Sequence, residues 1–311
     1  MSLLNKVVKN ERQRLFIQTS MNRFKSAEIG PSAAAIAYYL LLSLFPLLIA
    51  IGNMLPYLNM DPDKILPYIE SMVPPNIFSM LKGTIRSLLS SSSGGLLSVS
   101  AIATLWASSR SINALQNSLN KVFGVERRAN MFLTRIFSFG VISLFMLTVM
   151  ILAVVFSFGQ AVLDYILPLL NVSNSVVLDI TDLFGTLKWP VTVAMLFLTM
   201  CLIYSALPNA RVSWRSVVPG AILTTIGWMV LTQFFGLYTK YFSSSLVSYG
   251  IIGGFVVFML WLDFAATLIL LGGVINAICE EFIHGTIETR QSKFQKVMLK
   301  WRRKTNKKQK D

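Results

Sequence analysis

The chain has 311 residues, of which 54% are hydrophobic and 14% charged, and its mean hydropathy is +0.61. A soluble domain carries about 25% charged residues, so this composition excludes an ordinary soluble protein and indicates a polytopic membrane protein. In such a protein the formal net charge of +14 points first to the positive-inside rule rather than to nucleic acid. Cys201 and Cys279 both lie in apolar runs, which predicts neither a disulfide framework nor a cysteine metal site.

We expect an all-α bundle of six transmembrane helices. Charge-free runs cover residues 29–60, 87–109, 136–163, 189–210 and 216–239, and a sixth run, 241–279, is interrupted only by Asp263. A span needs about 20 residues, and five runs meet this comfortably. The second has a short apolar part, residues 96–107, and hydroxyls recur every four residues at Ser100, Thr104 and Ser108. It is either a full span packed inside the bundle or a re-entrant hairpin, and we favour the full span because the topology needs it.

The charge distribution favours both termini on the cytoplasmic side of the cell membrane. Six spans with this orientation put 23 of the 28 Lys and Arg on the inner side and five on the outer side. The chain then divides into a basic cytoplasmic segment (1–28), a six-helix membrane domain (29–284) and a basic cytoplasmic tail (285–311). The first 28 residues are too polar for a signal-peptide core, so we expect no cleavage.

Two segments outside the charge-free cores have an amphipathic pattern typical of interfacial helices. The outer one follows Pro74-Pro75 and has apolar residues at helical spacing: Ile77, Leu81, Ile85 and Leu88. The inner one has a similar stripe: Ile112, Leu115, Leu119 and Val122. The outer helix is expected to lie either on the outer face or over a cavity mouth. For both segments the favoured interpretation is a plain connecting helix at the membrane surface.

Three ordered blocks of residues carry a resemblance to a known family. The first runs from Ala33 to Pro46, with Tyr38-Tyr39 and Ser43-Leu44-Phe45-Pro46 inside it. The second runs from Tyr204 to Asn209 and ends in Leu207-Pro208-Asn209; Arg211, Trp214, Pro219-Gly220-Ala221 and Trp228 follow it. The third contains Tyr249-Gly250, Gly253, Trp261 and the stretch Leu271 to Ala277 with Asn276. Trp106 with Ser108 and Arg110 adds a weaker fourth block. This ordered set, over about residues 20–285, resembles the YihY family, also called the BrkB or ribonuclease BN-like membrane family.

The resemblance implies an integral membrane protein with six spans and cytoplasmic termini. Transport of lipids or other envelope amphiphiles is the family activity most consistent with this sequence. We interpret the ribonuclease label of the family as a misassignment. The sequence departs from the family at Val274, where members often have an acid, and at Asp263, where they often have an aromatic residue. These positions are eleven residues apart, about three helical turns, so we interpret the acid as moved along one helix face.

Asp263 is the leading candidate for a functional residue. A charged side chain in mid-bilayer costs about 2.5–3.5 kcal/mol on insertion scales, and such residues usually face an interior or a wet cavity. It is either a proton, cation or headgroup contact or a structural acid that locks two helices together. Ser43, Thr199 and Thr225 are mid-bilayer residues that could serve as its partners.

Tyr38, Tyr39, Ser43 and Pro46 of the first span are candidate lining residues for the same inter-helix cavity. Pro46 leaves the carbonyl of Leu42 without its helical donor, and a kink beside Ser43 would open a polar pocket. The alternative is a kinked helix whose tyrosines simply pack. We interpret Pro208, Asn209, Pro219 and Gly220 as architecture. Five glycines of the last run are interpreted as sites of close helix approach inside the bundle or, less favoured, in a dimer: Gly250, Gly253, Gly254, Gly272 and Gly273.

No catalytic constellation is visible in the sequence, and we expect no enzyme activity, metal or cofactor. Glu280, His284 and Glu288 share helical spacing, which either forms a polar helix end or touches a metal. The basic tail, Lys300 to Lys310, is expected to attract anionic lipid rather than RNA, because no aromatic residues or RNA-binding fold accompany it. We therefore expect a carrier or binder of a lipid-like substrate or, alternatively, a membrane scaffold or assembly factor. The sequence does not decide the substrate or the oligomeric state.

Overall fold

The computed structural model describes residues 20–21, 23–58, 61–90, 96–126, 140, 174–248 and 250–290. The regular elements in these ranges are all helical and are, in order, α3 (Ile29–Met54), the 3-10 turn η1 (Leu55–Leu58), α4 (Pro62–Met72), α5 (Pro75–Ser90), α6 (Leu96–Phe123), α8 (Asn174–Ala206), α9 (Trp214–Ser248) and α10 (Gly250–His284). The expected all-α class is confirmed.

Four described helices are long and apolar enough to cross a membrane. They cover Arg23–Asn53, Trp189–Ala206, Trp214–Thr239 and Ile252–His284, and they match the first, fourth, fifth and sixth predicted spans. Of the second predicted span, residues 87–90 belong to α5 and 96–109 form the first half of α6, whose 28 residues would reach about 42 Å. The third, residues 136–163, lies outside the described residues apart from Gly140. The polytopic helical fold is therefore observed, whereas the exact count of six still depends on the sequence.

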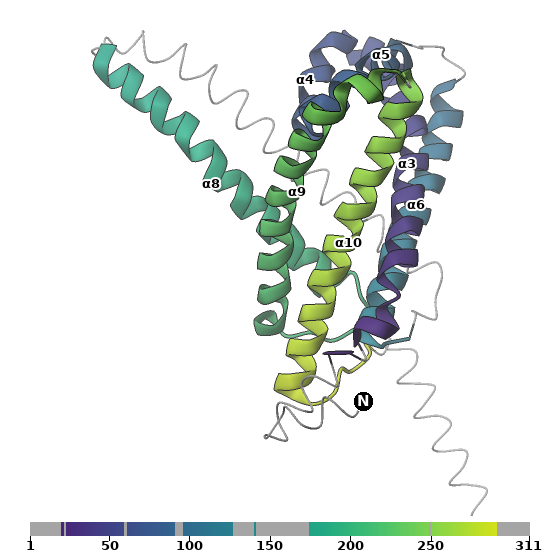
Figure 1. Cartoon of the computed structure of the whole chain (residues 1–311), viewed down its shortest axis with the longest axis vertical. Coiled ribbons are helices and arrows are strands. Elements are labelled where there is room, and N and C mark those ends of the chain that lie inside the picture. The colour runs from purple at the N-terminus through teal and green to yellow at the C-terminus, as the bar shows by residue number, and fades with distance from the viewer. Residues whose placement is uncertain are drawn as a thin grey trace, which may run out of the picture.

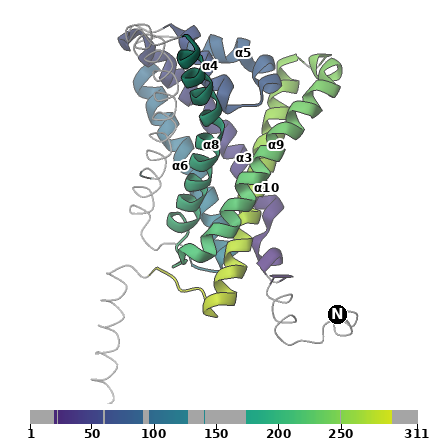
Figure 2. The same cartoon turned by 90° about the vertical axis from the view of Figure 1, so that its left-hand side faces the viewer.

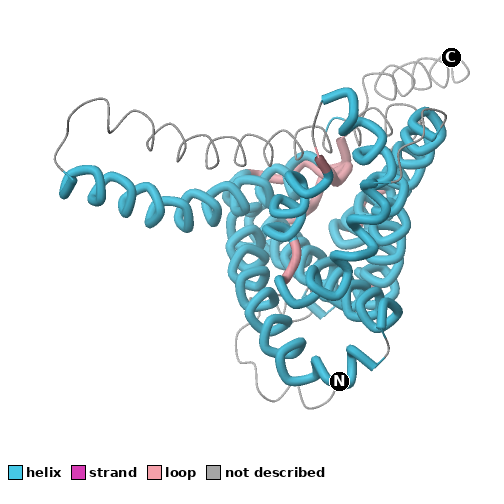
Figure 3. The backbone as a smooth tube through the Cα atoms, turned by 90° about the horizontal axis from the view of Figure 1, so that it is seen from above, coloured by secondary structure: helices cyan, strands magenta, loops and turns pink. Residues whose placement is uncertain are grey.

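The bundle has two distinct ends (Figure 1). Helix α3 packs along α6 and against α10, α10 packs along α9, and α9 contacts α8. α3 begins at the end where α6, α8 and α10 finish and α9 starts; we call this the charged end. Helices α4 and α5 lie across the opposite end (Figure 2). The first half of α8 extends away from the other described helices, which is also visible from above (Figures 1 and 3).

α5 confirms the helix expected after Pro74-Pro75, and it packs more deeply than an interfacial helix would. Ile77, Leu81 and Ile85 are buried in a hydrophobic cluster with residues of α9 and α10. At Gly52 of α3 a Cβ would overlap the backbone of Leu89, so the end of α5 lies directly against α3. The apolar stripe therefore covers the ends of the spans rather than lying on a membrane surface.

The amphipathic stripe from Ile112 to Val122 is not a separate interfacial helix, and that prediction was wrong. It is the second half of the continuous helix α6. Leu119 and Val122 are completely buried, and their methyl groups lie close to Gly273 of α10. The stripe was misassigned because Arg110 interrupts the apolar run, and a charge was taken to end the span. Helix α4 was not predicted, because its apolar pattern is short.

Candidate functional site

Asp263 lies within α10, with 13 residues before it and 21 after it in the helix. Asp263 as a whole residue is only partly buried. Its Oδ1 atom, however, is buried and has no hydrogen-bond partner within the described part of the chain. A buried carboxylate oxygen without a donor is costly, because it has lost its water without a replacement.

Two contacts fix the height of Asp263 relative to α3. At the charged end Arg23 Nε donates to Glu281 Oε2 at 2.8 Å, and further along the bundle the rings of Phe45 and Phe255 lie 5.3 Å apart. Because the two helices are antiparallel, interpolation between these contacts places Asp263 at the height of Tyr38 and Tyr39. The predicted cavity residues of α3 and α10 are thus brought to the same depth.

The described residues do not, however, connect these side chains by hydrogen bonds. The hydroxyl of Ser43 donates to the carbonyl of Leu40 at 2.7 Å, so it is used by its own helix. The Tyr38 and Tyr39 rings contact each other edge to face at 5.3 Å, and Tyr38 is 51% exposed. Pro46 lies inside α3, which continues through it to Met54.

The other proposed partners of Asp263 are not joined to it either. Thr199 donates to the carbonyl of Met195 at 2.8 Å. Thr225 Oγ1 is buried without a partner among the described residues, and so is Nε1 of Trp261, two residues before Asp263. The Trp261 ring contacts Trp228 at 5.4 Å and stacks on Phe258 at 5.9 Å. The face of α10 that carries Trp261 therefore packs against aromatic rings of α9 and of α10 itself.

A polar junction of α8, α9 and α10 lies nearer the charged end. We define it by Tyr204, Gly220, Thr224, Gly272 and Asn276. The Tyr204 hydroxyl lies 2.6 Å from Thr224 Oγ1 and donates to the carbonyl of Ile269 at 2.7 Å. The amide of Gly220 donates to Asn276 Oδ1 at 2.7 Å. All three polar side chains are completely buried, so the junction holds three helices together by hydrogen bonds in the apolar region.

The two glycines of the junction permit this close approach. A Cβ at Gly220 would overlap the carbonyl oxygen of Gly272 and the Asn276 amide. A Cβ at Gly272 would overlap Thr224 Oγ1 and the Tyr204 hydroxyl. Gly220 and Asn276, expected to be architectural, are here in direct contact. Tyr204 belongs to the second block of the family resemblance, but sequence reasoning gave it no role, and it missed Thr224, whose only signal was a polar atom within an apolar run.

Asn209, in the turn after Pro208, connects four segments at the charged end. Its amide N–H donates to Asn120 Oδ1 at 2.7 Å, its Nδ2 donates to the carbonyl of Glu126 at 3.0 Å, and its carbonyl accepts from the Arg290 amide at 2.9 Å. Ala210 and Thr289 form an antiparallel bridge beside it. Burial, and then the neighbouring Arg211, lower the pKa of Arg290 from its usual value. Pro208 and Asn209 thus fasten the loop after α8 to the ends of α6 and α10.

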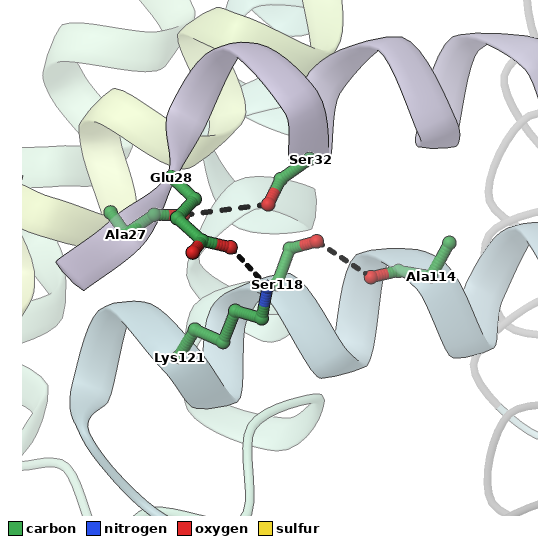
Figure 4. A network of polar contacts seen from close by, with 6 residues as sticks. All are labelled: Ala27, Glu28, Ser32, Ala114, Ser118 and Lys121. Carbon is green, nitrogen blue, oxygen red and sulfur yellow. Dashed lines mark hydrogen bonds and ion pairs between the residues drawn. The ribbon is translucent and has the colours of Figure 1, made fainter. Parts of the chain in front are cut away.

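Ion pairs also join the start of α3 to its neighbours at this end. Besides the Arg23–Glu281 pair, Lys121 Nζ of α6 lies 2.6 Å from Glu28 Oε2 (Figure 4). In the same view Ser118 donates to the carbonyl of Ala114, and Ser32 donates to the carbonyl of Ala27. Glu28 has the left-handed backbone conformation, φ 44° and ψ 51°, directly before α3. The break between the preceding turn and the first span is therefore held by contacts to α6.

The carboxylates suggested as metal ligands have other partners. Glu280 Oε2 accepts from the amide of Ser213, immediately before α9, at 2.9 Å, and its Oε1 lies 3.0 Å from His284 Nδ1. Glu288 Oε2 pairs with Arg211 at 3.1 Å. Among the described residues no group of three or more His, Cys, Asp or Glu side chains is placed to hold a metal. Glu280 instead favours the start of α9, where free amides and the helix dipole attract an anion.

The remaining motif glycines lie at the far end of α10. The helix begins at Gly250, Gly253 is buried, and a Cβ at Gly254 would touch Leu81 of α5 at 3.0 Å. These positions support the expected packing role inside the bundle. Tyr249 and the basic tail from Lys300 to Lys310 lie outside the described residues.

Comparison with known proteins identifies the family. The family described as Virulence factor BrkB matches residues 20–296. The chain belongs to the BrkB family. A BrkB relative in Bacillus subtilis (strain 168), named putative ribonuclease-like protein YfkH, is 31% identical over 263 residues, which cover 85% of this chain and 94% of the relative.

Other BrkB relatives are named only as membrane proteins. A UPF0761 membrane protein of Pseudoalteromonas translucida is 26% identical over 276 residues, 86% of this chain and 87% of the relative. A UPF0761 membrane protein of Coxiella burnetii is 31% identical over 108 residues, 32% of this chain and 38% of the relative. No solved structure matches the chain. The resemblance seen in the sequence is therefore confirmed.

Proposed function

We propose that this BrkB-family membrane protein binds or translocates a lipid-like or other envelope amphiphile between its helices, with Asp263 as the polar contact. The observation that carries the proposal is the buried Oδ1 atom of Asp263, which no described residue satisfies. Its height beside Tyr38 and Tyr39 on α3 supports a shared polar locus between α3 and α10. Placing a carboxylate at this depth costs about 2.5–3.5 kcal/mol on insertion scales. Binding of a polar substrate group to Asp263 would explain why the chain has an acid there.

In the same proposal the charged end faces the cytoplasm of the cell, and both termini are cytoplasmic, because Lys and Arg concentrate there. The basic residues from Lys300 to Lys310 attract anionic lipid at the membrane surface, each by about 1 kcal/mol. No cofactor is invoked. The ribonuclease-like name of the Bacillus subtilis relative is not carried over, since Glu280 and Glu288 are engaged by Ser213 and Arg211.

The test is lipid movement in proteoliposomes that hold the purified full chain and a labelled phospholipid. We expect Asp263→Asn to reduce the rate at least about tenfold, because a neutral amide loses the charge-assisted hydrogen bond to a cationic or hydroxylated headgroup. Ser43→Ala should reduce it less, because Ser43 already bonds to Leu40. Unchanged rates in both variants would remove Asp263 and Ser43 from the site, and no lipid movement by the wild-type protein would remove the transport activity.

The second candidate is a membrane scaffold that transports nothing. The polar junction of α8, α9 and α10 and the ion pairs of the charged end favour it, because they fix the helices against one another. A scaffold predicts that the wild-type protein and Asp263→Asn both leave lipid movement at the level of empty liposomes, and that the substitution changes only thermal stability. The proteoliposome assay and a melting curve on the same samples distinguish the two functions.

A further inference from the structure

We propose that the outward face of α6 binds the phosphodiester group of a phospholipid at Arg110, inside the membrane. This site is separate from Asp263 and does not depend on transport, since a protein that only holds lipid would bind there equally well. We define the outer strip of α6 by one set of residues at helical spacing: Val99, Ile102, Trp106, Arg110, Asn113, Asn117 and Lys121.

Arg110 is exposed on the surface of α6 and lies near the middle of the helix, far from both of its ends. It is eleven residues before Lys121, which marks the charged end through its pair with Glu28, so it lies about 16 Å further along the helix. α6 is antiparallel to α3, and this register places Arg110 at the height of Tyr39. That is the depth already found for Asp263. A guanidinium cannot lose its proton to reduce the cost of burial in hydrocarbon, so at this depth it needs an anionic partner.

No described residue supplies that partner. The described ion pairs do not include Arg110, and Asp263 at the same depth is not paired with it. Its guanidinium instead lies over the Trp106 ring, 5.3 Å from the centroid. Trp106 is one turn further from the charged end, so this contact holds the cation at depth rather than toward the nearer membrane surface.

The strip changes character at Arg110. Towards α5 it is apolar and uncovered by described residues: Val99, Ile102 and Trp106 are 63%, 68% and 54% exposed. Towards the charged end it is polar, because Asn113 and Asn117 follow Arg110 before Lys121. Both asparagines are partly exposed, and no hydrogen bond of their side chains occurs within the described ranges. The hydroxyls of Thr104 and Ser108 bond to the carbonyls one turn earlier and do not take part.

This arrangement fits a phospholipid that enters from the leaflet at the charged end. The side-chain amides of Asn113 and Asn117 offer uncharged donors between the charged end and Arg110. The two parallel N–H groups of the Arg110 guanidinium match two oxygens of a phosphodiester. The apolar half of the strip leaves the acyl chains in hydrocarbon. We commit to a phosphodiester rather than to a protein carboxylate, because the described residues leave Val99, Ile102, Trp106 and Arg110 exposed, so that acyl chains and a charged headgroup can both contact this part of the strip.

The test measures lipid binding to the full chain by native mass spectrometry, with phosphatidylglycerol compared against diacylglycerol of the same acyl chains. We expect the wild-type protein to prefer phosphatidylglycerol by about tenfold or more, and Arg110→Gln to abolish most of this preference. Arg215→Gln is the matched control, since Arg215 is an exposed arginine at the start of α9. The control should change the preference by less than about twofold, as expected for a charge at the membrane surface.

Two further variants keep the test decisive if Arg110→Gln does not fold. Arg110→Lys retains the charge but not the two parallel N–H donors of the guanidinium, so it should lose part of the lipid preference. Asn117→Leu should weaken the lipid preference while leaving the charge of Arg110 unchanged. Separately, in a chain without Cys201 and Cys279, an anionic thiol reagent should modify Asn117→Cys rapidly and Val99→Cys slowly.

Three outcomes overturn the proposal. The first is an unchanged lipid preference in every strip variant that folds. The second is a lowered melting temperature of Arg110→Gln with the preference intact, which would mean that an acid of the chain neutralises Arg110. The third is equal modification of Asn117→Cys and Val99→Cys. None of them bears on Asp263, whose failure would appear in lipid movement and not in this binding preference.

Discussion

A methyl group added at Gly272 would overlap Thr224 Oγ1, the Tyr204 hydroxyl and the carbonyl oxygen of Gly220. Two of these neighbours are fixed by the hydrogen bonds of the polar junction, so they cannot move away without breaking them. We therefore expect Gly272→Ala to destabilise the protein by about 1–3 kcal/mol, as for other overpacked interiors. The measurement is the melting temperature in detergent, followed by the loss of the monodisperse peak on size exclusion.

Gly236 provides the control for this substitution. It lies inside α9, and a Cβ there would meet nothing within 4 Å. Gly236→Ala should leave the melting temperature unchanged or raise it slightly, because alanine is favoured over glycine in a helix by about 0.5–1 kcal/mol. If both alanines lowered the melting temperature equally, the contact between α9 and α10 at Gly272 would not be the cause.

At the scale of elements, two ion pairs of different exposure tie the segment directly before α3 to α10 and to α6. The Arg23 and Glu281 side chains are 19% and 29% exposed, while those of Lys121 and Glu28 are 44% and 58% exposed. Solvent screens the second pair more strongly, so we expect the Arg23–Glu281 pair to have the larger coupling energy, about 1 kcal/mol.

Double-mutant cycles measure both couplings as changes in unfolding free energy. One cycle uses Arg23→Gln with Glu281→Gln, and the other uses Lys121→Gln with Glu28→Gln. Raising the salt concentration should reduce the coupling of the exposed pair first. A larger coupling for Lys121 and Glu28 would contradict the expectation that solvent exposure decides which pair is stronger.

The elements also show which parts of the fold the sequence could predict. Long charge-free runs predicted the four helices that are long and apolar enough to cross a membrane, because hydrocarbon tolerates few charges and a helix is the only open-ended structure that satisfies its own backbone. α5 was found through its apolar spacing. α6 was misread, because its amphipathic second half and Arg110 look like an interfacial segment when hydropathy is read in one dimension. The contact of Leu119 with Gly273 that buries this half depends on tertiary packing, which composition does not report.

The candidate site was predictable only in part, for a similar reason. The cost of a charge in hydrocarbon singled out Asp263, and the helix register brought it to the height of Tyr38 and Tyr39. Which hydroxyl is free to meet it depends on rotamers: Ser43 bonds to Leu40 and Thr199 to Met195. The polar junction was not predicted, because Tyr204 and Thr224 form their hydrogen bonds only where α8, α9 and α10 pack together in the folded protein.

For the whole molecule, the uneven placement of charge sets the orientation in the membrane. The charged end carries Arg23, Lys121, Arg211, Arg215 and Arg290, whereas α5 at the opposite end carries Lys82 and Arg86. Because positive residues are retained on the cytoplasmic side during insertion, we expect the charged end to face the cytoplasm. A single-cysteine experiment on intact cells tests this directly.

In a background without Cys201 and Cys279, Lys82→Cys and Arg215→Cys each present one exposed thiol, at opposite ends of the bundle. A membrane-impermeant maleimide should label Lys82→Cys in intact cells and label Arg215→Cys only after lysis. The two positions act as controls for each other, since labelling of both before lysis indicates leaky cells. The reverse pattern would invert the topology, and phospholipid entering along Asn117 and Asn113 toward Arg110 would then come from the outer leaflet.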